Sequence, residues 1–408
     1  MPFFSIFKST FLLLFILCSA CAQKKEQKST SLSKETPLLK KETIVAANRM
    51  EAYLPIIKDK KIALVTNQTS VVFKPKGHMH LVDTLLSLNV TLKKVFAPEH
   101  GFRGKADAGE LVKDGLDTKT QLPIISLYGK NKKPSKKQLE GIEIVLFDIQ
   151  DVGVRFYTYI ATLQLVMEAC AENNIPVLVL DRPNPNATYI DGPTMETAHK
   201  SFLGMNSIPL VYAMTIGEYA QMVNEEGWLS NGVKADLKVI PLKNWNHQTP
   251  YALAIRPSPN LPNDMSINLY PSLGLFEGTT VNAGRGTEEQ FQRYGASFLD
   301  SSQYGFKYVP KPNFGSKHPK EEGKTCYGED LSKTNRMNSV SLKWLIKAYK
   351  NSSNKKTFFK TSSFTKHSGT EKLQKQIEAG LSENEIKASW QNDIEAFKEI
   401  RKKYLIYD

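Results

Sequence analysis

Residues 143–155 read EIVLFDIQDVGVR, a run of apolar residues that ends abruptly in Asp148, Asp151 and Arg155. Four other segments of the chain share this design. Together the strand-like runs are Lys61–Thr66, Thr91–Ala97, Pro123–Leu127, Glu143–Phe147 and Pro176–Leu180. Between them lie helix-like stretches at His80–Leu88, Ser135–Gly141 and Tyr157–Asn173. Strands that alternate with helices predict βαβ units and therefore an α/β fold around a parallel sheet.

Each strand-like run ends in a short polar cluster, and these clusters hold most of the reactive side chains. They contain Asn67; Glu99, His100 and Arg103; Tyr128; Asp148, Asp151 and Arg155; and Asp181 and Arg182. In an open parallel sheet, ligands bind outside the carboxyl ends of the strands, where these clusters fall. The sequence therefore predicts one cleft lined by carboxylates, arginines and amides, which indicates an enzyme.

The first twenty residues have the pattern of a secretory signal peptide. Lys8 precedes the apolar run Phe11–Leu17, which is too short to span a membrane, and small residues follow it. The segment Cys18–Cys21 resembles a lipoprotein signal, so we expect lipidation at Cys21 and a location in the cell envelope, periplasmic or at the outer membrane. An ordinary secretory signal is the alternative.

The residues after this signal lack aromatic side chains and are rich in Lys, Ser, Thr and Glu. This composition predicts that residues 21–45 form a flexible tether. The whole chain has 54 Lys and Arg against 41 Asp and Glu, a net charge of +13. The basic runs lack interleaved aromatics and the chain carries an export signal, so we expect a basic surface that favours a cell-wall polymer or an anionic membrane, not nucleic acid.

The segment Arg256–Thr287 is dense in Pro, Gly, Asn and Ser and has no sustained period. Long irregular stretches inside a domain are usually functional, and this one holds Asn260, Glu277 and Arg285. Arg285 lies between two glycines and can approach an anionic group closely, although a surface turn is the alternative. Near the end of the chain, Glu383–Tyr404 predicts one amphipathic helix. Its core-facing residues are Ile386, Trp390, Ile394, Phe397 and Ile400.

Glu99 is the first candidate for catalysis. It follows a hydrophobic strand, and partial desolvation there would raise its pKa and suit it to be a general acid. The alternative is a loop carboxylate that pairs with Arg103 or caps a helix. Asp148 and Asp151 could steer a water, orient a substrate amide or bind a metal, or one of them could cap the next helix. Asp181 and Arg182 could equally be a structural pair.

Several motifs are absent from the sequence. There is no GxGxxG after the first strand, no GxxxxGK[ST] and no GxSxG, so we expect neither a dinucleotide site, a P-loop nor an α/β-hydrolase elbow. His78 and His80 lack nearby carboxylate or cysteine ligands, so we expect no metal there. No cofactor and no obligate protein partner is evident from the sequence.

Longer motifs in the chain resemble the NamZ/YbbC family. They are Leu64–Thr69, Phe96–Gly104, Phe147–Tyr159, Leu180–Pro185, Pro257–Pro262, Leu275–Thr279 and Gly284–Thr287, and the segment Glu383–Tyr404 is similar too. The resemblance spans roughly Glu42 to Asp408. The sequence departs from the family pattern at Lys366–Thr370, where a more apolar run is expected before Gly369.

The resemblance implies an exo-acting β-N-acetylmuramidase that releases N-acetylmuramic acid from the non-reducing end of peptidoglycan fragments. It also implies a Rossmann-like catalytic domain, expected at residues 46–300, and a smaller α+β domain at residues 301–408, with the active site between them. A non-catalytic, lipid-anchored peptidoglycan-binding protein is the alternative, and a metal-dependent deacetylase or amidase is a third possibility.

A glycosidase usually needs one acid to protonate the leaving oxygen and a second group at the anomeric carbon. Glu99 suits the first role, and the second falls to Asp148, Asp151, Glu277 or the acetamido group of the substrate. The lactyl carboxylate of muramic acid calls for an arginine. The candidates are Arg103, Arg155 and Arg285, with Asn67, His100, Tyr128, Tyr157, Asp181, Arg182 and Asn260 as further substrate-binding residues.

Overall fold

The computed structural model describes residues 41–103 and 114–407. Glu42–Asp408 is one compact unit. The predicted signal peptide, the lipidation site at Cys21 and almost all of the tether lie outside the described residues. Within those residues, no helix is both long enough and apolar enough to cross a membrane.

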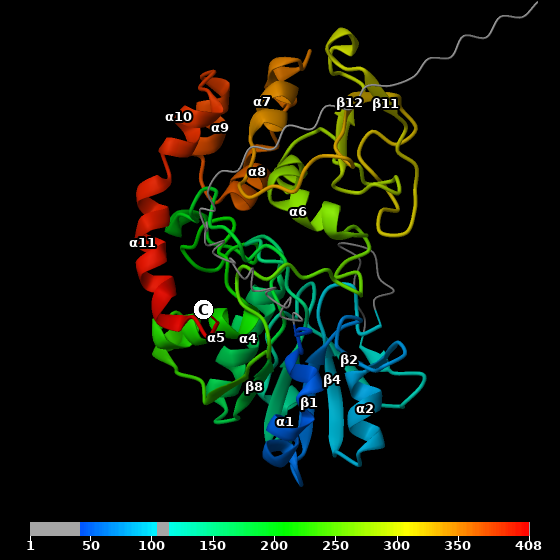
Figure 1. Ribbon diagram of the computed structural model, residues 1–408, viewed down its shortest axis with the longest axis vertical. Coiled ribbons are helices and arrows are strands. Elements are labelled where there is room, and N and C mark those ends of the chain that lie inside the picture. The colour runs from blue at the N-terminus through cyan, green and yellow to red at the C-terminus, as the bar shows by residue number, and fades with distance from the viewer. Residues whose placement is uncertain (1–40, 104–113, 408) are drawn as a thin grey trace, which may run out of the picture. The chain divides into compact units, whose positions relative to one another are not determined.

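A seven-stranded sheet forms the centre of the unit, in the order β5-β6-β4-β1-β7-β8-β9 (Figure 1). The strands are β1 (Ile62–Thr66), β4 (Leu92–Ala97), β5 (Gly115–Leu116), β6 (Pro123–Ser126), β7 (Ile144–Asp148), β8 (Val177–Leu180) and β9 (Leu237–Ile240). All neighbours pair in parallel except β5, which runs antiparallel to β6. Numbered along the chain, the six parallel strands lie in the order 3-2-1-4-5-6, the Rossmann order, which confirms the predicted fold class.

Both faces of this sheet are covered, as a buried parallel sheet requires. Strand β7 shows why, because Ile144 and Leu146 join one apolar cluster while Val145 and Phe147 join the other. The helices of this part are α1 (Met50–Ile57), α2 (Leu81–Ser87), α3 (Lys136–Leu139), α4 (Tyr159–Glu172) and α5 (Ile216–Glu225). A small hairpin, β2 (Val71–Phe73) and β3 (His78–His80), precedes α2.

The later residues build a second group of elements, seen above the central sheet in Figure 1. A three-stranded antiparallel sheet has the order β10-β12-β11, with β10 at Arg293–Ala296, β11 at Phe306–Tyr308 and β12 at Cys326–Asp330. The helices are α6 (Asp264–Leu273), α7 (Lys343–Lys350), α8 (Thr361–Ser368), α9 (Lys372–Glu378), α10 (Glu383–Ala388) and α11 (Gln391–Arg401). Figure 1 shows α11 running back from this group toward α5.

Two expectations about local structure were wrong. The segment expected to be irregular contains α6, which begins at a capping box formed by Asn263 and Ser266. The single terminal helix is instead two helices, α10 and α11, which are separated at Trp390. The indole of Trp390 donates a 3.1 Å hydrogen bond to Oδ1 of Asp191. Of the predicted core face, Ile386, Trp390, Ile394 and Phe397 are buried and Ile400 is partly buried.

Candidate active site

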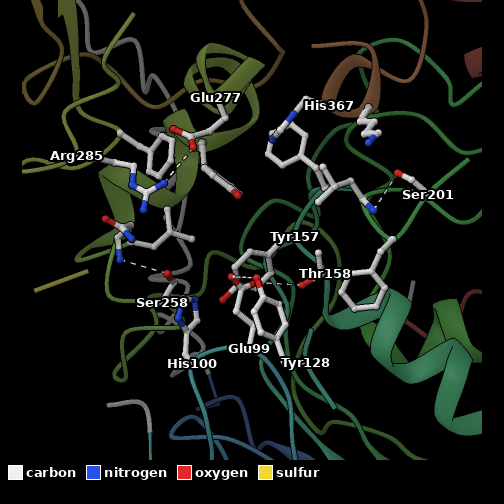
Figure 2. A pocket seen from close by; sticks show the side chains of 18 of the residues that line it. Glu99, His100, Tyr128, Tyr157, Thr158, Ser201, Ser258, Glu277, Arg285 and His367 are labelled. Carbon is white, nitrogen blue, oxygen red and sulfur yellow. Dashed lines mark hydrogen bonds and ion pairs between the residues drawn. The ribbon is translucent and has the colours of Figure 1, made fainter. Parts of the chain in front are cut away.

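A cavity of about 680 Å³ lies at the carboxyl ends of β4 and β6 and takes residues from both parts of the unit (Figure 2). Its walls carry five charged side chains, a set of aromatic rings and several hydroxyl and amide groups. They are Glu99, His100, Tyr128, Gly129, Lys132, Phe156, Tyr157, Thr158, Ser201, Phe202, Leu203, Ser258, Asn260, Leu261, Tyr270, Glu277, Arg285, Phe291, Lys366 and His367. The position agrees with the rule for ligand sites in parallel sheets.

Glu99 follows β4 and is held at the cavity wall by two hydroxyl groups. The phenol of Tyr128, at the end of β6, donates a 3.0 Å hydrogen bond to Oε1 of Glu99. The hydroxyl of Thr158, just before α4, lies 3.5 Å from Oε2. Figure 2 shows the three side chains together at one edge of the cavity. The predicted position of Glu99 in a cleft at a strand end is the one that it occupies.

Glu277 and Arg285 form an ion pair on another side of the cavity, with Arg285 Nη1 3.0 Å from Glu277 Oε2 (Figure 2). Nη2 of Arg285 also donates to the carbonyl of Gly315 at 3.2 Å. Gly286 has a φ of 80°, and a Cβ there would lie 2.7 Å from the carbonyl oxygen of Lys311. The glycine beside Arg285 is therefore required by the close packing of this turn.

The electrostatic environment keeps Glu277 ionised. Burial alone would raise its pKa, but the charges of Lys320, Arg285 and His367 hold the pKa at about 2. The ammonium of Lys320 donates to the carbonyls of Phe276 and Glu277 at 2.8 and 3.1 Å, and burial lowers its pKa to about 8. Glu277 is thus an anion at neutral pH, which suits it to stabilise positive charge rather than to donate a proton.

Aromatic rings form a continuous wall between these two groups of polar residues. Phe156 and Tyr270 meet edge to face at 5.1 Å between ring centroids, and Tyr270 meets Phe291 at 4.8 Å. The phenol of Tyr157 donates a 2.7 Å hydrogen bond to the carbonyl of Pro257, which fixes its ring in the wall. Such rings offer apolar faces on which a sugar can pack.

Asn260 also lines the cavity and is nearly fully buried. Its Nδ2 donates to the carbonyl of Gly315 at 2.8 Å, so Asn260 and Arg285 are held by the same carbonyl oxygen. Among the predicted site residues, the cavity therefore brings together Glu99, His100, Tyr128, Tyr157, Asn260, Glu277 and Arg285.

Asp148 and Arg182 do not line this cavity. They form a buried bidentate ion pair, with Nε to Oδ1 at 2.6 Å and Nη2 to Oδ2 at 2.9 Å. Both side chains are almost without solvent exposure. Burial raises the pKa of Asp148, and Arg182 opposes that shift. The pair satisfies both charges within the protein, and the partner of Arg182 is Asp148, not its chain neighbour Asp181.

Arg155 is buried outside the cavity wall as well. Its guanidinium donates to the carbonyls of Pro193 and Ile208 at 2.6 and 2.9 Å and to those of His367 and Ser368 at 3.0 and 2.7 Å. Burial lowers the pKa of Arg155 to about 9. The side chain thus joins the loop after β7 to the C-terminal end of α8, through hydrogen bonds from Nη1 and Nη2 to backbone oxygens.

Two further predicted carboxylates, Asp151 and Asp181, are buried. Asp151 accepts hydrogen bonds from the phenol of Tyr212 and from the backbone of Gly153, and burial raises its pKa to about 6. Asp181 accepts from the hydroxyls of Thr215 and Tyr407 at 2.7 and 2.6 Å, and burial raises its pKa to about 7. Neither lines the cavity.

The remaining predicted residues lie near β1 and β4. Asn67 is buried, and its Oδ1 accepts from the backbone of Thr69 at 2.9 Å. Arg103 makes two hydrogen bonds to Asp117, at 3.1 and 2.7 Å, and borders a separate cavity of about 390 Å³. In the described ranges, no group of three or more His, Cys, Asp or Glu side chains has the geometry to hold a metal ion.

Sequence reasoning missed several residues that line the cavity, including Lys132, Thr158, Ser258, Tyr270, Lys366 and His367. Thr158 and Ser258 lie inside motifs that resemble the family, so the motifs around them could have marked both as candidate site residues. Tyr270 was hidden because its helix was not predicted. His367 comes from α8, in the segment where the sequence departs from the family pattern, and nothing nearby marked it as part of a site.

Comparison with known proteins agrees with this geometry. The family models described as exo-beta-N-acetylmuramidase NamZ, N-terminal and C-terminal, match residues 62–265 and 268–407. The predicted domain boundary at residues 300 and 301 stays a prediction. The chain is 38% identical over 376 residues to the peptidoglycan beta-N-acetylmuramidase NamZ of Bacillus subtilis, which covers 87% of this chain and 89% of that protein.

Two crystal structures of DUF1343 family proteins from Bacteroides fragilis are also similar. The first has a TM-score of 0.83 and 43% identity, and the second has 0.76 and 26%. Each match covers 90% of this chain and 99% of the other. Because the two family models together span most of the chain, the protein belongs to the NamZ exo-beta-N-acetylmuramidase family and is a glycoside hydrolase.

Proposed function

We propose that the protein is an exo-acting β-N-acetylmuramidase that releases N-acetylmuramic acid from the non-reducing end of peptidoglycan fragments. The observation that carries the proposal is the placement of Glu99 at the cavity wall, held by Tyr128 and facing a space that Glu277 also lines. The description of the family and the name of the Bacillus subtilis relative support the same reaction.

In this proposal, Glu99 donates its proton to the glycosidic oxygen as the bond from that oxygen to C1 breaks. Water adds to C1 and its proton restores the carboxylic acid. Of the three carboxylates predicted as the second group, Glu277 lines the cavity, whereas Asp148 and Asp151 do not. The ionised Glu277 assists at C1 either directly or by orienting the acetamido group of the substrate, whose oxygen then attacks C1.

The experiment is an assay with a chromogenic β-N-acetylmuramide on wild type and Glu99→Gln. Wild type should release the chromophore, and Glu99→Gln should release it at least about a hundredfold more slowly, at an unchanged melting temperature. An inactive wild type that still binds the glycoside would instead support the non-catalytic binding protein. Exo action is tested on glycan chains with muramic acid at the non-reducing end, from which monosaccharide alone should appear. Release of longer oligosaccharides would overturn the exo assignment.

We also propose that lipidation at Cys21 attaches the protein to a membrane of the cell envelope. The support is the sequence pattern at Cys18–Cys21 and the tether that follows, which has no apolar or amphipathic feature of its own. Cells expressing wild type and Cys21→Ser are fractionated after labelling with a fatty-acid probe. Label and membrane association should be found in wild type and lost in Cys21→Ser. A soluble, unlabelled wild type would replace this proposal with an ordinary secretory signal.

A further inference from the structure

Among the described residues that line the main cavity, the permanent cations are Arg285, Lys132 and Lys366. Arg285 is paired with Glu277 at 3.0 Å, so its charge is already neutralised. The two lysines differ from it. In the described part of the chain, neither ammonium forms an ion pair with a carboxylate. The charged groups of the cavity are thus the Glu277–Arg285 ion pair, the carboxyl group of Glu99 and two lysines that form no ion pair within the described residues.

Lys132 belongs to the loop after β6, and its ammonium lies 4.5 Å from the centre of the Phe202 ring. That contact fixes the side chain at the cavity wall, since an aromatic face attracts a cation. The next residue, Lys133, behaves differently. Its ammonium lies 2.7 Å from Glu172 and 3.5 Å from Glu168, and it does not line the cavity. Of these two adjacent lysines, Lys133 has carboxylate partners, whereas Lys132 lines the cavity.

Lys366 reaches the cavity from the other part of the unit, because it lies on α8 immediately before His367. In Figure 2, Glu277, His367 and Ser201 follow one another along one edge of the cavity. Ser201 is the chain neighbour of Phe202, against which Lys132 packs. Lys366 and Lys132 therefore enter the same cavity from two different parts of the unit, α8 and the loop after β6.

The charge of the cavity in its reactive state follows from these contacts. Glu99 must carry a proton to act as the acid, and it is then neutral. Glu277 and Arg285 cancel each other. What remains is the charge of the two lysines, which a neutral sugar would leave uncompensated and an anionic sugar would balance.

We propose that Lys132 and Lys366 form a carboxylate-binding subsite that receives the lactyl group of the muramic sugar. The proposal rests on the proposed function and names the residues that select its substrate. It differs from the sequence-based expectation that an arginine would do this. Arg103 is bound to Asp117 outside the cavity, and Arg155 is bound to backbone carbonyls. Lysine suits the task because a flexible ammonium acts as a point charge without requiring a fixed two-pronged geometry.

The test compares two substrates, the chromogenic β-N-acetylmuramide and the same glycoside with its lactyl carboxylate converted to a carboxamide. The variants are Lys132→Gln, Lys366→Gln and the double variant, with Lys133→Gln as the matched control. For wild type, kcat/KM should be about ten- to a hundredfold higher for the acid than for the amide, the usual effect of losing a charged hydrogen bond. The ratio should fall in each single variant and approach one in the double variant.

The control Lys133→Gln should keep the wild-type ratio, since it removes the same charge one residue away. A double variant that keeps the full ratio while remaining folded would overturn the subsite. So would a ratio near one in wild type, or a ratio that disappears in Arg285→Gln but not in the lysine variants. In each case wild type still hydrolyses the muramide, so the proposed function would stand. A wild type inactive on both substrates would instead remove the proposed function itself.

Discussion

The phenol of Tyr128 donates a hydrogen bond to Oε1 of Glu99 and thereby joins the ends of two adjacent parallel strands, β6 and β4. Burial and the neighbouring Glu99 raise the pKa of Tyr128, so its hydroxyl keeps its proton at neutral pH and remains a donor. Tyr128, which lies outside the loop that carries Glu99, therefore fixes the orientation of the proposed acid.

Replacing Glu99 with Gln should cut turnover of the muramide by about a hundredfold or more, because general acid catalysis contributes about that much. Gln keeps the shape of the side chain, so the melting temperature should stay close to that of wild type. The measurement is kcat beside a thermal unfolding curve. Near-wild-type kcat in Glu99→Gln would remove this residue from the role of acid.

The variant Tyr128→Phe should lose less activity than Glu99→Gln. It removes one hydrogen bond to a carboxyl group and leaves the ring in place, for a loss in kcat of about tenfold. The KM for the muramide should change little if Tyr128 orients Glu99 and does not itself hold the sugar. A raised KM at constant kcat would mean that the phenol binds substrate instead.

Glu277→Gln should lower the plateau of the kcat/KM pH profile by about a hundredfold, as expected for the loss of a group that stabilises developing charge. With its pKa held at about 2, Glu277 is ionised throughout the range from pH 4 to 8. The acidic limb of the profile should therefore stay at the same pH in variant and wild type. A limb that moves in the variant would show that Glu277 titrates within the working range.

The ion pair between Asp148 and Arg182 yields a prediction about stability. Asp148→Ala should lower the free energy of unfolding by about 3–5 kcal/mol, because it leaves a buried guanidinium without a counter-charge. The double variant Asp148→Leu with Arg182→Met should recover much of that loss. Urea unfolding of both variants provides the measurement. A stable but inactive Asp148→Ala would instead support the catalytic role predicted from the sequence.

The pKa of Asp181 predicts how stability depends on pH. Burial raises this pKa from its ordinary value of 3.8 to about 7, so between those values the native protein holds a proton that the unfolded chain has lost. The contribution is complete below the unfolded pKa and is lost as the pH rises through the folded pKa. The free energy of unfolding should therefore fall with rising pH, by at most about 1.4 kcal/mol per pH unit for this group.

The variant Asp181→Asn cannot titrate and should show a smaller fall, measured by urea unfolding at several pH values. Asp151→Asn is the matched comparison, since burial raises the pKa of Asp151 only to about 6. Between pH 6 and 7 the slope should thus be reduced more by Asp181→Asn than by Asp151→Asn. Identical profiles in the two variants would contradict this assignment.

Much of the fold could be predicted because five strands of the central sheet, β1, β4, β6, β7 and β8, are short apolar runs that end in polar residues, and this pattern is local. The site was harder to predict, since the end of a strand indicates the backbone position of a residue but not the direction of its side chain. Glu99 and Asp148 both follow strands of the sheet, yet one reaches the cavity and the other meets Arg182. The distinction depends on partners 29 residues away for Glu99 and 34 residues away for Asp148, which no local pattern encodes.

Arg155 has a consequence for recombining members of this family. It binds the residues after β7 to the end of α8, and the acceptors on α8 are the carbonyl oxygens of His367 and Ser368, which any amino acid would supply. A crossover near residue 266 between two relatives should therefore preserve this connection whatever side chains each parent contributes. The exception is Gly369, where a Cβ would lie 2.6 Å from Nη2 of Arg155, so the parent that supplies the residues after the crossover should carry glycine there.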